Sequence, residues 1–277
     1  MEKHIIDLYD YFGVTRPVGA QGYLTAYIID DYDYCSGRVR PAMLVLGGGG
    51  YRYVSSREQE PIAFEYTAKG FQTFILEYSV APLGYPTQLI EACMAMAYIR
   101  ENAEKFYVDK EHVCSIGFSA GGHLCGMLAT LHDRHEVNAV FNSRKVNCRP
   151  DAVILCYAVL SAYNKTHEGS VNNITLGNEQ LKKIVDIPAM VNENTPPAFI
   201  WATSNDNSVP VESSLLMALS YRKYDIPVEL HVYENGTHGL SLGTKEVCTV
   251  NQSVQSWVDL SHKWLISKGF VVKEKGE

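Results

Sequence analysis

Short apolar runs rich in β-branched residues recur along this chain of 277 residues, and stretches of helical character separate most of them. This alternation is typical of βαβ units and predicts an α/β fold, with a mainly parallel central sheet and helices on both faces. No internal repeat, low-complexity tract or Pro/Ser-rich linker divides the sequence, so we expect one domain over residues 1–277. The predicted strands are residues 24–29, 42–46, 72–77, 112–117, 152–157, 198–203 and 228–233.

Two of the intervening helices have recognisable ends. Ser55 and Glu58 have the spacing of a capping box, which would begin a helix. Gly70 is placed to end that helix at a C′-like position. A second helix is expected to begin at Pro86, because proline is tolerated in a first helical turn.

The segment 161–197 departs from this alternation. It is polar, rich in Asn and Lys and only weakly periodic, although residues 179–185 could form a short helix. An insertion of this length between two core strands is either a short lid over a functional site or an ordinary surface excursion. The sequence favours neither interpretation.

The most specific motif is Gly-Phe-Ser-Ala-Gly-Gly at residues 117–122, directly after an apolar run and directly before a helix-like stretch. A G-x-S-x-G in that context forms a nucleophile elbow, a strained strand-to-helix turn that exposes the serine hydroxyl. The N-terminal N–H groups of the following helix point toward the reacting carbonyl. Ser119 is therefore the candidate nucleophile. The alternative is that the motif is a Gly/Ser-rich turn without a catalytic role.

Serine is a weak nucleophile at neutral pH and needs a general base, which in folds with this elbow follows the serine and an acid along the chain. His231 lies inside an alternating strand and His262 on the last helix, whereas His238 occupies a loop just past a strand end. Reactive groups of α/β sheets gather at such ends. We therefore predict His238 as the base, with a surface loop histidine as the alternative.

Two aspartates compete for the role of the acid that orients His238. Asp206 follows the strand 198–203 at its carboxyl end, whereas Asp225 ends a helix just before Ile226-Pro227, at the opposite edge of the sheet. An acid in this role holds the imidazole in the right tautomer and stabilises the imidazolium. The position of Asp206 predicts it as that acid, and Asp225 as a turn residue.

Four consecutive glycines, residues 47–50, follow the second predicted strand. Glycines there let backbone N–H groups approach a ligand closely and stabilise a developing oxyanion. We predict Gly49, Gly50 and the Ala120 amide as the donors. A dinucleotide-binding loop is the alternative, but no glycine stands at the last position of G-x-G-x-x-G.

Composition limits the partners of this chain. Its formal net charge of −7 and pI of about 5.7 argue against nucleic acid. No stretch of about 18 apolar residues indicates a membrane span, and charged residues come too early for a signal peptide. The 7 cysteines form no C-x-x-C pair and look like reduced core residues, so we expect a cytoplasmic protein. Residues 132–135 lack the H-E-x-x-H pattern, and we expect neither metal nor cofactor.

Taken together, the motifs resemble the α/β-hydrolase superfamily, and within it the esterase/lipase-like enzymes close to bifunctional feruloyl and acetyl-xylan esterases. Some relatives in that group are labelled xylanase or sugar hydrolase. The resemblance runs from about residue 40 to the last helix. It is carried by residues 48–51, 56–61, 117–124, 166–170, 206, 209–212 and 227–239.

This resemblance implies an α/β-hydrolase fold and the same triad of Ser119, Asp206 and His238. It also implies that Arg57, with its neighbour Glu58, shapes the pocket, although a helix-capping turn explains that pair equally well. The chain departs from the hormone-sensitive-lipase relatives, which have His where Gly47 precedes the three glycines. The substrate preferences of that family are therefore not implied.

The candidate substrate-binding residues are Tyr51, Arg57 and His167, all within the matching segments. Tyr51, Tyr53 and Trp201 could stack on a sugar ring, although aromatic residues beside strands more often belong to the core.

The expected activity is hydrolysis of small carboxylic esters through an acyl-serine intermediate, with an O-acetyl group on a sugar as one candidate substrate. A peptidase of the prolyl-oligopeptidase type is the second enzymatic candidate, although such enzymes usually have a large additional domain. A non-catalytic binding protein on a hydrolase scaffold is the third, and the intact triad argues against it. The sequence does not fix an oligomeric state.

Overall fold

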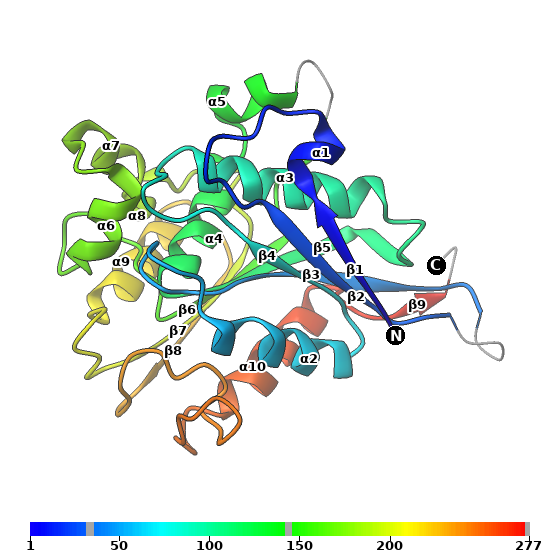
Figure 1. Cartoon of the computed structure of the whole chain (residues 1–277). Helices are drawn as coiled ribbons and strands as arrows, with labels where there is room; N and C mark the ends of the chain where they lie inside the picture. The colour runs from blue at the N-terminus through cyan, green and yellow to red at the C-terminus, as the bar shows by residue number, and fades with distance from the viewer. Residues whose placement is uncertain (32–35, 142–145, 275–277) are drawn as a thin grey trace.

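The computed structural model describes residues 1–31, 36–141 and 146–274. Within these residues nine strands form one sheet, in the order β1-β2-β4-β3-β5-β6-β7-β8 with β9 paired to β3 (Figure 1). The strands are β1 (Glu2–Asp7), β2 (Tyr23–Ile28), β3 (Arg38–Leu46), β4 (Gln72–Glu77), β5 (Val108–Phe118), β6 (Ala152–Cys156), β7 (Ala198–Thr203), β8 (Val228–Tyr233) and β9 (Lys273–Glu274).

Six neighbouring strands, β4-β3-β5-β6-β7-β8, run parallel, whereas β1, β2 and β9 pair antiparallel. Every predicted strand is present, and the mainly parallel sheet is confirmed. The sequence analysis missed β1 and β9 at the two ends of the chain. β1 is an edge strand that is largely exposed, so its sequence lacks the apolar alternation that reveals a half-buried strand.

Helices cover both faces of the sheet, as predicted (Figure 1). One face carries α1 (Leu8–Phe12), α3 (Thr87–Glu101), α4 (Ala120–Leu131) and α9 (Glu212–Lys223), and the other carries α2 (Glu60–Ala68) and α10 (Ser256–Ser267). Residues of β3 alternate between the two hydrophobic clusters, because successive side chains of a strand point to opposite faces. Leu44 and Leu46 join the first cluster, whereas Met43 and Val45 join the second.

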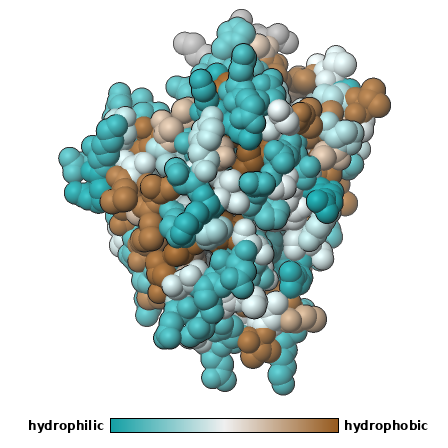
Figure 2. Space-filling model, turned by 90° about the vertical axis from the view of Figure 1, so that its left-hand side faces the viewer, coloured by the Kyte–Doolittle hydropathy of each residue, from teal (hydrophilic) through white to brown (hydrophobic). Residues whose placement is uncertain are grey.

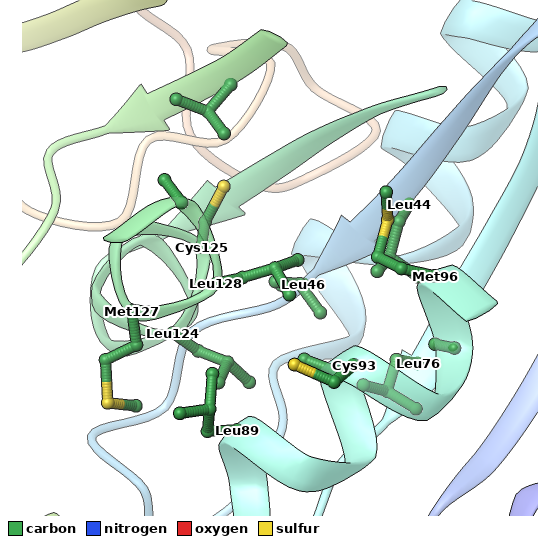
Figure 3. Packing of buried hydrophobic residues seen from close by; sticks show 14 of the residues in the cluster. Leu44, Leu46, Leu76, Leu89, Cys93, Met96, Leu124, Cys125, Met127 and Leu128 are labelled. Carbon is green, nitrogen blue, oxygen red and sulfur yellow. The ribbon is translucent and has the colours of Figure 1, made fainter. Parts of the chain in front are cut away.

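The larger cluster fixes α3 and α4 against the middle of the sheet. Leu89 and Cys93 of α3 and Leu124 and Leu128 of α4 lie over β3 residues such as Leu46 (Figure 3). All five side chains are fully buried. Burying one leucine side chain contributes about 1.5–3 kcal/mol, so this layer holds the two helices firmly in place.

The segment 161–197 folds into α6 (Glu168–Thr175), α7 (Glu179–Ile184) and α8 (Ile187–Met190), at the left of Figure 1. α7 matches the short helix predicted at 179–185. Apolar side chains of this segment, such as Ile174 and Ile187, are fully buried in the larger hydrophobic cluster, and the Ile187 N–H donates to the Leu160 carbonyl at 3.0 Å. The segment is therefore packed onto the sheet domain, and motion as a lid stays a prediction.

Two predicted helix starts have different outcomes. The structure contradicts the capping box, because Ser55 makes no side-chain capping bond and the Glu58 side chain is buried instead. A short 3₁₀ turn, η1 (Ser56–Glu58), precedes α2, and Gly70 follows the end of α2 with a left-handed φ of 96°, as predicted. Pro86 is the N-cap of α3, which begins one residue later.

The remaining short helices of the described chain are α5 (His135–Asn138) and η2 (Ala139–Phe141). Within the described ranges, no helix combines the length and the hydropathy that crossing a bilayer needs. Five of the six described cysteines are buried free thiols, whereas Cys248 is exposed. Cys35 lies outside the described residues.

Candidate active site

Ser119 occupies a one-residue turn between the end of β5 and the start of α4. Its φ of 52° and ψ of −117° lie in a region that L-residues rarely adopt, which costs about 1–3 kcal/mol. The surrounding backbone holds the residue there: its N–H donates to the Cys156 carbonyl at 3.0 Å, and its carbonyl accepts from the N–H groups of His123 and Val159. This is the geometry of a nucleophile elbow.

The glycines around Ser119 are required by close backbone contacts. A Cβ on Gly117 would lie 2.2 Å from the Gly121 carbonyl oxygen, and one on Gly121 would lie 2.2 Å from the Leu46 carbonyl oxygen. A Cβ on Gly122 would lie 2.5 Å from the Cβ of Ala158. Contacts this short exclude any side chain, so steric fit explains the spacing of the motif.

The structure brings Ser119, His238 and Asp206 together from three different strand ends. His238 Nε2 lies 2.8 Å from Ser119 Oγ, and His238 Nδ1 lies 2.7 Å from Asp206 Oδ2. The residues follow β5, β8 and β7, whose carboxyl ends meet at one edge because these strands are parallel. Ser119 and His238 are thus within proton-transfer distance.

Asp206 is buried and holds the imidazole in one orientation. Its Oδ1 accepts hydrogen bonds from the N–H groups of Ser208 and Val209 at 2.8 and 3.0 Å. Burial opposes ionisation of this carboxyl, but the His238 hydrogen bond, the His238 charge and the two N–H groups outweigh it and hold its pKa below the usual value. An ionised Asp206 accepts a hydrogen bond from the Nδ1–H group of His238 and leaves Nε2 free to accept the Ser119 proton.

The alternatives for the acid and the base lie elsewhere. Asp225 occupies an exposed turn with a φ of 54° and pairs with Arg222. The His231 ring stacks on Phe199 at a centroid distance of 5.0 Å, and His262 packs against Phe71 from the last helix. None of the three contacts Ser119, so the geometry selects the residues that chain order predicted.

The four glycines after β3 form a tight loop beside Ser119. Gly49 and Gly50 have φ values of 125° and 65°, and a Cβ on Gly49 would lie 2.1 Å from the Tyr53 carbonyl oxygen. Both line the pocket next to Ser119. Ala120 is the first residue of α4, directly after Ser119. These three residues stay the predicted oxyanion donors.

The buried Glu58 carboxylate holds the glycine loop through hydrogen bonds. Its Oε2 accepts the Gly48 N–H at 2.7 Å and its Oε1 accepts the Tyr157 hydroxyl at 2.7 Å. Tyr157 Oη in turn accepts the Ser241 N–H at 2.9 Å, and the Tyr157 ring packs edge-on against His238 with centroids 5.1 Å apart. One carboxylate therefore connects the glycine loop to the segment that carries the histidine.

Burial makes Glu58 harder to ionise than an exposed glutamate. It raises the pKa of Glu58, although the hydrogen bonds from Tyr157 and Gly48 and the nearby charges of His238 and Arg57 oppose the shift. The pKa values of two carboxyl groups in one site are thus shifted in opposite directions: that of Asp206 is lowered and that of Glu58 is raised.

The site opens into a small pocket of about 250 Å³. Its wall contains no aliphatic side chain among the described residues. It is formed by Gly49, Gly50, Arg52, Tyr53, Ser55, Arg57, Glu58, Ser119, His167, Gly169, Asn173, Ser208, His238 and Gly239. Of the predicted substrate-binding residues, Arg57 and His167 lie in this wall.

Tyr51 does not line the pocket, so its predicted substrate contact is wrong. Its side chain is fully buried, and its hydroxyl lies 2.7 Å from His123 Nδ1. His123 donates its Nε2 proton to the Val185 carbonyl, so Nδ1 is the acceptor for Tyr51. Trp201 is also buried, stacked on Trp257, whereas Tyr53 is 60% exposed at the pocket mouth. Only Tyr53, of the three aromatic candidates, can meet a sugar.

His167 enters the pocket from the 161–197 segment, as the N-cap of α6. Its Nδ1 accepts from the Ser170 N–H at 3.2 Å, so the neutral ring carries its proton on Nε2. Burial lowers the pKa of His167, and the charges of His238 and Arg52 lower it further against the opposing Asp206. A neutral ring with an Nε2 proton can donate a hydrogen bond to substrate.

Comparison with known proteins agrees with this geometry. The family model BD-FAE matches residues 35–220. The chain belongs to the BD-FAE family. The crystal structure of an acetyl ester-xyloside bifunctional hydrolase from Caldicellulosiruptor lactoaceticus superimposes with a TM-score of 0.83 at 33% identity, covering 97% of each chain. The α/β-hydrolase fold and the family resemblance are thereby confirmed.

Two curated relatives of this BD-FAE chain are longer proteins. Endo-1,4-beta-xylanase B of Butyrivibrio fibrisolvens is 36% identical over 214 residues, which are 75% of this chain and 33% of the relative. Acetylxylan esterase of Xylanibacter ruminicola is 28% identical over 212 residues, which are 73% of this chain and 42% of the relative. The chain thus spans less than half the length of either protein.

Some pocket features of this family member were not predicted from the sequence. Asn173 donates to the Gly50 carbonyl at 2.8 Å and so ties the 161–197 segment to the glycine loop. Arg52 and Ser208 also line the pocket. Their positions in loops give no periodic signal, and for Arg52 the only hint was its place two residues after the last of the four glycines. Among the described residues, no group of three or more His, Cys, Asp and Glu side chains could hold a metal.

Proposed function

We propose that this chain is a serine esterase that removes short acyl groups, above all O-acetyl groups, from sugars. The observation that carries the proposal is the hydrogen-bonded series Ser119–His238–Asp206 beside the glycine loop, facing a small polar pocket. Ester hydrolysis as the reaction class is shared by the esterases among the relatives and structural neighbours. That the alcohol part of the ester is a sugar and the acyl part an acetyl group is the more specific part of the proposal.

The geometry supports a two-step acyl transfer. Ser119 Oγ attacks the ester carbonyl carbon while its proton moves to His238 Nε2, 2.8 Å away. The carbonyl oxygen becomes an oxyanion, which the N–H groups of Gly49, Gly50 and Ala120 stabilise. His238 then protonates the leaving alcohol oxygen, the C–O bond breaks, and an acyl-serine remains. Water, deprotonated by His238, attacks the acyl-serine, and the carboxylic acid leaves with Ser119 restored.

The pocket wall supports a short acyl group. It lacks aliphatic side chains within the described residues, and each buried methylene contributes about 0.8 kcal/mol only where apolar surface receives it. The end of the molecule that bears α6 and α7 faces the viewer in Figure 2, where hydrophilic and intermediate residues cover most of the surface. A lipid-type acyl chain would gain little here.

Acetylated sugars are supported by two relatives in particular. The names of one curated relative and one structural neighbour state acetylxylan and acetyl ester-xyloside as their substrates. In this chain, Tyr53 at the pocket mouth and the His167 Nε2 proton offer a stacking surface and a hydrogen-bond donor for a sugar. The endo-xylanase activity named for the Butyrivibrio fibrisolvens relative is not part of the proposal, since the chain spans only 33% of that relative.

The test is release of acetate from acetylated xylo-oligosaccharides by purified protein, with Ser119→Ala as the control. In parallel, kcat/KM for p-nitrophenyl esters of two to twelve carbons should fall with chain length. A fluorophosphonate probe should label wild type and spare Ser119→Ala, which separates an esterase from a non-catalytic scaffold. Acetate release by Ser119→Ala, or a preference for the longest esters, would overturn the proposal, and preferential cleavage of aminoacyl amides would favour a peptidase.

A further inference from the structure

The pocket beside Ser119 is unusually basic for this chain. Arg52 and Arg57 both line it beside the neutral His167 ring, although the formal net charge of the protein is −7. Within the described residues its wall contains one carboxyl group, Glu58, and both oxygens of that group already accept hydrogen bonds from Gly48 and Tyr157. The pocket therefore concentrates positive charge where the protein as a whole is acidic.

Arg57 lies on the histidine side of the pocket. A Cβ built on Gly239, the residue after His238, would lie 3.2 Å from Arg57 Nη2. The backbone of Arg57 is held in place, because the Ser241 hydroxyl donates to its carbonyl at 2.6 Å. The guanidinium thus lies next to the loop that carries the base, on an exposed side chain that can reach a bound substrate.

Arg52 lies on the side of the glycine loop. Its N–H donates to the Gly49 carbonyl at 3.0 Å, so its backbone is part of the same turn. Arg52 and His167 line the same pocket, so the Arg52 side chain borders the space that a substrate would occupy. One arginine therefore lies beside the His238 loop and the other in the glycine turn, and both line the pocket.

Apart from the effect of the Arg57 charge on the buried Glu58, neither arginine has a partner among the described residues that explains it. Among the described residues, neither Arg52 nor Arg57 forms an ion pair, in contrast to Arg16, Arg100 and Arg134 elsewhere in the chain. A guanidinium that presents a planar set of N–H donors suits a carboxylate, which it can bind through two parallel hydrogen bonds.

We propose that the preferred substrate is an ester whose alcohol part carries a carboxylate close to the scissile bond, as in an acylated sugar acid, and that Arg57 and Arg52 bind this carboxylate. The inference rests on the proposed esterase function and narrows its substrate class. A singly charged carboxylate fits better than a phosphate, because repulsion by the nearby Asp206 grows with the charge of the substrate.

The first experiment compares 4-acetoxybenzoate with its neutral isostere 4-acetoxybenzamide. For each ester, kcat/KM is divided by the hydroxide-catalysed rate to remove the difference in leaving group. Wild type should prefer the carboxylate ester, and added salt should reduce the preference, because exposed charges are screened. In Arg57→Gln the normalised kcat/KM of the carboxylate ester divided by that of the amide should fall about tenfold, mainly because KM for the carboxylate ester rises. Arg52→Gln should show a smaller fall in the same ratio.

Arg222→Gln is the matched control. Arg222 is an exposed arginine of α9 that pairs with Asp225, outside the pocket wall, so its substitution should leave the ratio unchanged. An equal ratio in wild type and Arg57→Gln would overturn the proposal, even if both esters were hydrolysed well.

A binding measurement separates this inference from the esterase function itself. Calorimetric titration of Ser119→Ala with 4-acetoxybenzoate requires no turnover, and affinity should fall about tenfold when Arg57→Gln is added. If wild type hydrolysed no ester but this difference in binding remained, the proposed function would fail and the carboxylate site would stand. Equal affinity of Ser119→Ala with and without Arg57→Gln would exclude a carboxylate-binding site at Arg57.

Discussion

Two glycine-rich turns meet at the active site, and they are held in place by different kinds of contact. The elbow at 117–122 is fixed by close packing, with hypothetical Cβ contacts of 2.2 Å to neighbouring backbone oxygens. The loop at 47–50 is closely packed at Gly49, where a Cβ would lie 2.1 Å from the Tyr53 carbonyl oxygen, but in addition polar side chains of other segments bind its backbone. Glu58 binds its Gly48 N–H, the Tyr78 hydroxyl donates to its Gly47 carbonyl at 2.6 Å, and Asn173 binds its Gly50 carbonyl.

This difference explains why the elbow is easier to recognise. A turn fixed by steric fit imposes small residues at set spacings, which appear as a local motif. A loop fixed by remote hydrogen bonds imposes only its own glycines, and the residues that hold it are scattered over the chain. The predictions below test that contrast.

The largest expected effect is on kcat, when the Ser119 hydroxyl that the elbow exposes, or its base His238, is removed. Ser119→Ala and His238→Ala should each lower kcat by about 10⁶, and the double variant should be little worse, because nucleophile and base act as one unit. Steady-state kinetics with p-nitrophenyl acetate measures this, with melting temperatures to confirm folding. A double variant far worse than either single one would mean that the two residues act independently.

The sequence predicted the parts of this site that local sterics and strand order decide. The strand ends, Ser119 and the order of acid and base follow from such rules. The family resemblance implied that Glu58 shapes the pocket together with Arg57, but the residues alone did not decide this, since a charged residue three positions after Ser55 equally suits a helix cap. Nor did the sequence predict the burial of Tyr51, which depends on a hydrogen bond with His123, 72 residues away along the chain. Contacts of that kind leave no local pattern.

Asp206→Asn is expected to have the next largest effect. Its amide would favour the wrong tautomer of His238, and the precedent of serine proteases gives a loss of about 10⁴ in kcat. Asp225→Asn, in an exposed turn, is the matched control and should be almost silent. The reverse pattern would move the acid to Asp225.

Gly121→Ala tests whether steric fit holds the elbow. A methyl group 2.2 Å from the Leu46 carbonyl oxygen must displace backbone, and overpacking of this kind costs about 3 kcal/mol or more of unfolding free energy. Gly177→Ala is the control: its φ of 74° also disfavours alanine, but no atom lies within 4 Å of the new Cβ, so about 1 kcal/mol is expected. Equal losses in denaturant titrations would refute the steric explanation.

Glu58→Gln tests the remote hydrogen bonds of the glycine loop. A glutamine has one acceptor oxygen and cannot accept from both Gly48 and Tyr157, so the loop should shift. Removing an oxyanion donor costs about 10²–10³ in kcat, and a displaced donor should cost about 10- to 100-fold, with a smaller change in KM. Glu91→Gln alters another buried glutamate, bound to Ser79 and Tyr9. It should lower stability without this loss of kcat, and if both variants kept full kcat the loop would not depend on Glu58.

The smallest effect concerns the two carboxyl groups and pH. The folded state lowers the pKa of Asp206 below its ordinary 3.8, so Asp206 stabilises the fold fully above that pH, and this contribution is lost as pH falls through the lowered value. The folded state raises the pKa of Glu58 above its ordinary 4.5, so the protonated group favours the fold below that pH, and this advantage is lost as pH rises through the raised value.

Opposite slopes should therefore appear in one protein. The unfolding free energy of wild type minus that of Asp206→Asn should increase as pH rises from below 3.8, because the unfolded state then binds more protons at this residue than the folded state. The same difference taken with Glu58→Gln should decrease as pH rises from below 4.5, because there the folded state binds more protons. Urea titrations of the three proteins between about pH 3 and 8 measure both slopes. Parallel slopes would mean that Glu58 is stabilised as a carboxylate by Gly48 and Tyr157 more than burial penalises it, and the glycine loop would then rest on an ordinary ionised acceptor.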